Sequence, residues 1–270
     1  SVSRGLGDVY KRQTEGSIFE TLSAGMSWQT VTLNRGLFPT DGASTALSLS
    51  TTVPGSDLSY YRANLRQRYY QPLSSDLIFG FQGELGYLSA YGETEETPFF
   101  QNFYAGGPRS LRGFESNTLG PRSTDAPCYE FNYEEATCPN LIDADGDGEL
   151  DSPYYNPYAN NTSRYRDPPI GGNIKVEGSL QLIFRLPFIE DQRSMRSAFF
   201  FDFGNVFSDN CKDYQINCYK PSIDDLRYSY GVGITWITGF GPMSFAISKP
   251  TNAGPQAVSY THLTLPTTLQ

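Results

Sequence analysis

The sequence predicts an all-β protein, a transmembrane antiparallel β-barrel of which this chain supplies part. Three observations support this fold class. Apolar and polar residues alternate with period two in runs that mostly span roughly twelve to sixteen residues, longer than the strands of most soluble sheets. No helical period of useful length separates these runs, and no apolar stretch approaches the ~20 residues of a membrane helix. Compact turns and longer loops alternate between the runs, as in outer-membrane barrels.

Eight alternating runs can be placed along the chain. They lie near residues 18–32, 43–54, 58–71, 76–91, 172–187, 196–208, 226–238 and 241–249. Eight tilted strands would either close a small barrel or form part of a larger one, and alternation does not separate these two arrangements. A soluble β-sandwich alternates in the same way, but its strands are usually shorter, so the barrel is favoured.

Three of these runs show the two walls of a strand most clearly. Because successive side chains point to opposite faces, each run has one apolar wall and one wall with polar groups. In 76–91, the apolar wall is Leu77, Phe79, Phe81, Leu85 and Tyr87, opposite Gln82 and Glu84. In 172–187, the apolar wall is Ile174, Val176, Gly178, Leu180, Leu182, Phe184 and Leu186, opposite Asn173, Lys175, Glu177, Ser179, Gln181, Ile183 and Arg185. In 196–208, Phe199, Phe201 and Phe203 lie opposite Phe200, Asp202 and Gly204.

The connections differ at the two ends of the predicted sheet. One end carries the compact turns PTDG at 39–42, PLSSD at 72–76, PFIEDQRS at 187–194 and GFGP at 239–242. The other end carries PGSD at 54–57, a loop from about 92 to 171 and a connection from about 208 to 225. The long loops of outer-membrane barrels lie outside the cell, so the loop at about 92–171 is expected to be extracellular. PGSD is a short exception at that end.

Both ends of the chain differ from the rest. Residues 1–13 and 257–270 resemble translated sequencing-adapter sequence, and we interpret them as non-native. Residues 14–256 then form the barrel segment. The only histidine, His262, lies in an excluded end, and the whole chain carries a formal net charge of -9. Such an acidic chain is a poor candidate for nucleic-acid binding, which needs Lys and Arg patches against phosphate.

The four cysteines fall in the two longest connections, which lie at the same end of the predicted sheet. Pairing of neighbours, Cys128 with Cys138 and Cys211 with Cys218, would give two small disulfide loops. Disulfides of this kind indicate an oxidising location such as the periplasm or the cell surface. A zinc site built from all four cysteines is the alternative, but neither pair has the CxxC spacing expected of it.

The long loop contains an acidic stretch, DADGDGELD, from Asp143 to Asp151. Oxygen ligands at alternate positions around a glycine turn are what a calcium loop needs. The residues that would supply them are Asp143, Asp145, Asp147, the backbone carbonyl of Glu149, and Asp151. The position of the usual bidentate glutamate is Tyr154, and no flanking helices are predicted, so this would be an isolated loop of weak affinity. A solvated acidic loop without a metal is the alternative.

Catalytic signatures are missing from the sequence. It contains no nucleophile elbow, P-loop, HExxH or dinucleotide fingerprint. Without a histidine in residues 14–256, a Ser-His-Asp or Cys-His arrangement is impossible within this segment. The carboxylates cluster in the long loop and not in a defined pocket. We therefore expect no enzymatic activity.

The segment FYAGGPRSLRGFESNTLGP, residues 103–121, is too polar for a core strand and too rich in glycine for a helix. It resembles the signature loop of the outer-membrane protein assembly factors, the BamA insertase family. The Val-Arg-Gly-Phe tip of the family corresponds here to Leu111, Arg112, Gly113 and Phe114. Other stretches match in order: LNRGLFPTDG at 33–42, VPGSDLSYY at 53–61, GGN, SLQL and PFIED within 171–191, AFFFDFGNVF at 198–207 and GFGPMSFAISKP at 239–250.

The resemblance implies a sixteen-stranded barrel behind periplasmic POTRA domains, with strands eight to fifteen in this chain. It implies a function in folding and inserting nascent outer-membrane proteins, with outer-membrane lipids and assembly-machinery lipoproteins as partners and no required cofactor. The family can also place a disulfide in the loop that contains Cys128 and Cys138. A TamA-like barrel and a two-partner secretion transporter are alternatives within the superfamily. A passive porin or a surface receptor with a calcium-binding loop is the alternative from another class.

The resemblance also assigns roles to the loop. In the family, this loop folds back into the lumen and its arginine docks on polar residues of the inner wall. Here Arg112 would reach Asp202. The neighbouring wall position, commonly Glu in the family, is expected at Gln181, which would leave Arg112 one charged partner instead of two. Glu177, on the same face, is a candidate to compensate.

Overall fold

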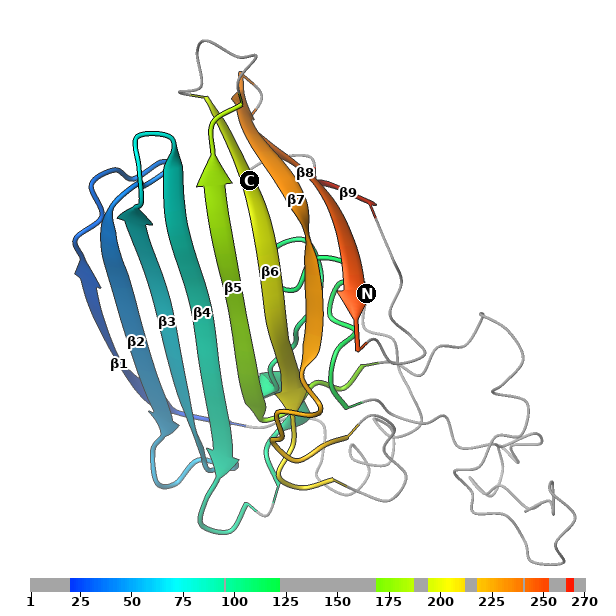
Figure 1. The fold of residues 1–270 in the computed structure, drawn as a ribbon. Coiled ribbons are helices and arrows are strands. Elements are labelled where there is room, and N and C mark those ends of the chain that lie inside the picture. Colours follow the sequence, from blue (N-terminus) through cyan, green and yellow to red (C-terminus); the bar gives the residue numbers. More distant parts are fainter. Residues whose placement is uncertain are drawn as a thin grey trace, which may run out of the picture.

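The computed structural model describes residues 20–94, 96–121, 169–186, 194–211, 218–239, 241–252 and 261–264. They contain one nine-stranded sheet, in which each strand pairs antiparallel with the next along the chain, as in the wall of an up-and-down barrel. Figure 1 shows the strands side by side, from β1 in blue to β9 in red. Their bounds are β1 Ser23–Val31, β2 Gly42–Thr52, β3 Tyr60–Pro72, β4 Leu77–Ala90, β5 Ile174–Phe184, β6 Met195–Phe207, β7 Arg227–Thr238, β8 Gly241–Thr251 and β9 Thr261–Thr264.

The eight predicted runs correspond in order to β1–β8, so the predicted all-β antiparallel fold is confirmed. The short β9 lies within residues 257–270, which we interpret as non-native, and it pairs with β8. A 3₁₀ turn, η1 Phe99–Gln101, follows β4. In the described part of the chain, no helix has the length and hydropathy needed to cross a membrane.

The two faces of the sheet differ as the alternation predicts. On β5 and β6, Leu180 and Leu182 are each 38% exposed and Phe199 is 55% exposed, whereas Phe200 and Asp202 on the opposite face are buried. Other large apolar side chains that remain exposed include Met26, Trp28, Leu85, Tyr230, Trp236, Phe245 and Ile247. Soluble monomers rarely expose so wide an apolar surface, and a lipid-facing barrel wall requires one.

Two of the three buried clusters lie where the chain after β4 packs against the inner face of the sheet, and the third lies on the sheet near the compact turns. In Figure 1 the segment after β4 is drawn in green and returns along the sheet beside β6 and β7. Burial of apolar surface between the loop and the wall is the main force that keeps the loop folded inward. The first cluster is Ala105, Leu111, Phe114, Leu119 and Val206, the second is Tyr60, Leu88 and Phe103, and the third is Tyr70, Ile183 and Ala198.

The connection between β1 and β2 is tied to β6 on the inner side of the sheet. Arg196 of β6 donates from Nη2 to the carbonyl oxygen of Pro39 at 2.9 Å. Its guanidinium lies over the rings of Tyr70, 4.8 Å from the centroid, and Phe38, 5.8 Å from the centroid. Phe38 has a φ of 48°, which is uncommon for a bulky side chain. Arg196 therefore holds a strained turn in place from across three intervening strands.

Replacing Arg196 with alanine is expected to destabilise the end of the sheet that carries the compact turns, by about 2 kcal/mol in the free energy of unfolding. The change removes a charge-assisted hydrogen bond and two cation–π contacts, which together are worth roughly this much. The matched control is Arg185→Ala, because Arg185 and its partner Asp76 have side chains 67% and 63% exposed. An exposed pair contributes at most about 1 kcal/mol. The effects of Arg196→Ala and Arg185→Ala are measured as shifts in the denaturant midpoint of the full-length protein that carries this segment. Equal midpoints for the two variants would contradict the role of Arg196.

Candidate functional site

The signature loop forms a tight tip that points back along the inner face of the sheet. Isolated bridges join Phe103 to Gly172 and Ala105 to Leu119, so the loop leaves and rejoins the wall in an ordered way. Within the tip, the amide of Gly107 donates to the carbonyl of Leu111 at 3.1 Å. Gly106 has a φ of 103°, and a Cβ there would lie 2.5 Å from the carbonyl oxygen of Glu115. The turn therefore requires glycine at this position.

The two apolar residues of the tip are fully buried. Leu111 is 0% exposed and Phe114 is 1% exposed, and both pack in one cluster with Val206 of β6. Burying a side chain of this size contributes roughly 1.5–3 kcal/mol relative to leaving it in water. Gly113, between them, has a φ of 92°, and a Cβ there would lie 3.0 Å from Oγ of Ser248 on β8. The tip therefore contacts the wall over β6 to β8.

Arg112 makes a two-pronged ion pair with Asp202 of β6. Its Nε donates to Oδ2 at 2.7 Å and its Nη2 donates to Oδ1 at 2.6 Å, while its backbone amide donates to Oδ2 at 3.2 Å. The Asp202 side chain is 0% exposed and that of Arg112 is 17% exposed. Paired hydrogen bonds between guanidinium and carboxylate are among the strongest polar contacts in proteins. The structure thus brings together the two residues that the sequence analysis paired.

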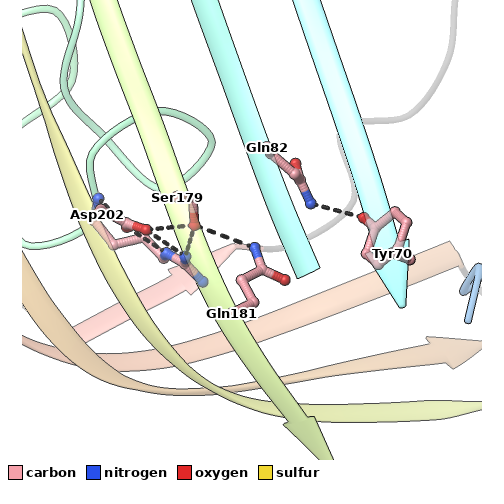
Figure 2. Close-up of polar contacts among 6 residues, drawn as sticks. Tyr70, Gln82, Ser179, Gln181 and Asp202 are labelled. Carbon is pink, nitrogen blue, oxygen red and sulfur yellow. Dashed lines mark hydrogen bonds and ion pairs between the residues drawn. The ribbon is translucent and has the colours of Figure 1, made fainter. Parts of the chain in front are cut away.

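Ser179 of β5 completes the contact. Its Oγ donates to Oδ1 of Asp202 at 2.6 Å and accepts from Nη2 of Arg112 at 2.9 Å. Figure 2 shows Asp202 and Ser179 meeting across β5 and β6, with Gln181 on the other side of Ser179. The sequence analysis placed Ser179 on the polar wall but did not assign it to this contact. Its position on the polar wall of 172–187 was the available signal.

The register of β5 and β6 places Ser179 directly opposite Asp202, and Gln181, the expected neighbouring wall position, lies two residues along the same face. Asp202 pairs with Ser179, and Gln181 pairs with Phe200. Nε2 of Gln181 donates to Oγ of Ser179 at 3.3 Å, so Gln181 supports the serine that contacts Arg112.

Glu177 has a different role from the expected one. It was a candidate to compensate for the missing carboxylate beside Arg112. In the structure, its Oε1 accepts from Oγ of Ser110, and its Oε2 lies 2.8 Å from Nζ of Lys175. Its contact with the loop is therefore two residues before Arg112, at a separate point of the tip.

A ring stacks beneath the guanidinium of Arg112. Its Cζ lies 3.5 Å from the centroid of the Phe200 ring, which is 4% exposed. A guanidinium over an aromatic face in a partly desolvated site is stabilised by the ring quadrupole. The Phe200 ring also approaches β7, where a Cβ on Gly231 would lie 2.7 Å from its Cζ. Sequence reasoning placed Phe200 on the polar wall but did not recognise this role.

The structure joins Cys211 and Cys218 in a disulfide with an S–S distance of 2.04 Å. Cys128 and Cys138 lie outside the described residues, and so do the calcium-loop residues Asp143, Asp145, Asp147, Glu149 and Asp151. Among the residues that the structure describes, no group of three or more His, Cys, Asp or Glu side chains is arranged to hold a metal ion.

Peptide mapping without reduction is expected to recover two local disulfides from protein isolated in its membrane. Trypsin cuts between Cys211 and Cys218 at Lys212, and a glutamate-specific protease cuts between Cys128 and Cys138 at Glu134. Each pair should then appear as two peptides joined until reduction. Linkage between the pairs, or four free thiols that bind zinc, would contradict the predicted pairing.

Comparison with known proteins gives consistent matches. A family model described as the Omp85 superfamily domain matches residues 4–261, a range that extends into both end segments. The outer membrane protein assembly factor BamA of Neisseria meningitidis serogroup B is 31% identical over 260 residues, which are 90% of this chain and 28% of that protein. The mouse sorting and assembly machinery component 50 homolog is 24% identical over 184 residues, 67% of this chain and 30% of that protein.

Among solved structures, BamA from Haemophilus ducreyi lacking POTRA domains 1–3 matches with a TM-score of 0.69 and 26% sequence identity. The match covers 97% of this chain and 47% of that one. The chain thus spans less than a third of the length of the curated relatives and about half of the solved structure.

Proposed function

The chain belongs to the Omp85 superfamily, and from this premise we propose that it is part of the barrel of an insertase that folds and inserts β-barrel proteins into the bacterial outer membrane. The observation that carries the proposal is the signature loop held against the inner wall by Arg112 and Asp202. A passive porin has no need of a buried Arg-Gly-Phe tip. The name of the Neisseria relative, an outer membrane protein assembly factor, supports the same function.

The bacterial outer membrane is the location of this barrel, and its outer wall suits that environment. The exposed leucines and phenylalanines of β5 and β6 would face lipid. We propose nascent outer-membrane proteins as clients and assembly-machinery lipoproteins as partners. Insertion then needs no catalytic residue, because a client strand exchanges backbone hydrogen bonds with an opened barrel edge while the bilayer is locally disturbed.

The docked loop would act on this process through the stiffness of the wall. It contacts β6 through Asp202, β5 through Ser179 and β8 beside Ser248, so it braces neighbouring strands from inside the sheet. A braced wall keeps its curvature, and the curvature of the wall sets how easily a barrel opens between two strands. The loop is therefore proposed to set the rate of client insertion without touching the client.

The direct test is reconstitution of a full-length protein that carries this segment into liposomes, followed by addition of an unfolded client barrel. Insertion is measured as the fraction of client that becomes protease-resistant and migrates as the folded form before heating. We expect insertion well above that of protein-free liposomes. A client that stays unfolded, together with steady single-channel conductance and a fixed solute preference, would instead identify a passive porin.

A further inference from the structure

Two carboxylates face each other directly on the inner wall. Glu84 of β4 and Glu177 of β5 are register partners, and their side chains are only 19% and 11% exposed. Like charges directly opposite each other in a sheet are destabilising, and partial burial strengthens the repulsion. The arrangement therefore requires a cation nearby.

Lys175 supplies that cation. Its Nζ lies 2.8 Å from Oε2 of Glu177 and 3.4 Å from Oε2 of Glu84, and its side chain is 11% exposed. The other oxygen of Glu84 accepts from Asn64 at 2.8 Å and from Arg66 at 3.3 Å. Glu84 is thus held from β3, whereas Glu177 contacts Lys175 and the loop.

Ser110 is the point where this network reaches the loop. Its Oγ accepts from the backbone amide of Gly106 at 2.8 Å, which closes the tip, and donates to Oε1 of Glu177. One hydroxyl thus serves both the internal turn of the tip and its contact with β5. This contact shares no residue with the Arg112–Asp202–Ser179 contact.

We propose that Ser110 and Glu177 form a second anchor of the signature loop, and that Lys175 is the positioning residue on which this anchor depends. Lys175 orients the Glu177 carboxylate toward the loop and offsets its repulsion with Glu84. The inference deepens the proposed function: its effect on client insertion rests on that function, but the existence of the anchor does not. A loop held at two separate points cannot pivot about Arg112, so the tip stays in one position on the wall.

The test measures release of the loop by its cleavage with trypsin after Arg109, an exposed residue beside Ser110, in folded full-length protein that carries this segment. Ser110→Ala and Lys175→Met are each expected to raise the cleavage rate roughly ten- to a hundredfold, as expected for loss of a hydrogen bond to a charged group. Lys175→Arg should stay close to wild type, because it keeps the cation. Lys249→Met is the matched control, since Lys249 is exposed on β8.

Double variants separate an anchor from a simple wall brace. Ser110→Ala combined with Lys175→Met should be cleaved no faster than Lys175→Met, because both changes break the same contact. If Lys175→Met fails to fold, the double variant Lys175→Met with Glu84→Gln removes the repulsion between positions 84 and 177 and restores the wall. Ser110→Ala changes only the loop and leaves the wall intact. Cleavage at the wild-type rate in Ser110→Ala, or a Lys175→Met variant that unfolds earlier without faster cleavage, would overturn the proposal. Client insertion is a separate readout that tests only the proposed function.

Discussion

Replacing Arg112 with alanine is expected to lower client insertion to about a tenth of the wild-type rate or less. The change leaves the Asp202 carboxylate, which is 0% exposed, without its paired hydrogen bonds. Removing one partner of a buried ion pair costs about 3–5 kcal/mol, and each ~1.4 kcal/mol is a factor of ten in an equilibrium. The Arg112 side chain keeps 17% of its surface exposed, so the lower end of that range applies. Even that end would shift the equilibrium from docked to released loop by about a hundredfold.

The measurement is the liposome insertion rate of a full-length protein that carries this segment. Asp202→Ala should have a similar effect, because it leaves the guanidinium of Arg112 unpaired at the wall. Arg109→Ala is the matched control: it is the same substitution three residues earlier, on an exposed side chain. Insertion at the wild-type rate in both Arg112→Ala and Asp202→Ala would refute the anchor.

Two further variants separate charge from geometry. Lysine at position 112 keeps the positive charge but cannot form two parallel hydrogen bonds to Asp202 or stack flat on Phe200. Arg112→Lys should therefore give an intermediate rate. Exchanging the pair, Arg112→Asp with Asp202→Arg, should recover part of the loss if charge pairing carries the effect. No recovery would indicate that the planar contact with Phe200 and Ser179 carries it instead.

The strands and their two faces could be predicted because the signals are local. Alternation along 196–208 assigns Phe199 and Phe201 to one wall and Asp202 to the other, and β6 has this arrangement. The pairing of Arg112 with Asp202 needed more than alternation, because the two residues are far apart in the chain. It came from the likeness of the loop to a known family.

The register of β5 and β6 could not be predicted in the same way, because it depends on where each strand leaves the turn. Strand ends at residues 187 and 196, as the alternation suggests, would place Gln181 opposite Asp202. The structure pairs Phe184 with Ser197, which brings Ser179 to that position. A shift of two residues keeps every side chain on its own face. The polar wall was therefore predictable, but the residue of β5 that lies opposite Asp202 was not.

The role of Phe200 could not be predicted from the sequence for a different reason. An aromatic residue on the polar wall of 196–208 is an exception to the alternation of apolar and polar residues. Its use depends on two neighbours that meet it only in the folded sheet: the guanidinium of Arg112 on one side and the bare backbone of Gly231 close to its ring on the other. The ring can lie flat under Arg112 only while β7 leaves room for it.

Gly231→Ala is therefore expected to displace Phe200 and release the loop. A Cβ at this position would lie 2.7 Å from Cζ of Phe200 and 2.0 Å from the carbonyl oxygen of Ile247. Overpacking of this kind typically costs 1–3 kcal/mol, occasionally more. We expect a lower denaturant midpoint, faster trypsin cleavage after Arg109 and a client insertion rate reduced toward that of Arg112→Ala.

Gly233→Ala makes the same change two residues along β7 and on the same face, so it is the matched control. Its Cβ would meet nothing closer than 3.4 Å, at the carbonyl oxygen of Phe245, which is ordinary contact. Both variants carry the same loss of glycine flexibility in the unfolded chain, so any difference between them reflects the folded wall. If the two variants had equal cleavage rates and equal insertion rates, the packing of β7 against Phe200 would have no part in holding Arg112. A slow Gly231→Ala variant beside a normal Gly233→Ala variant would place the limit on insertion in the wall around Gly231, where β7 packs against Phe200 and β8.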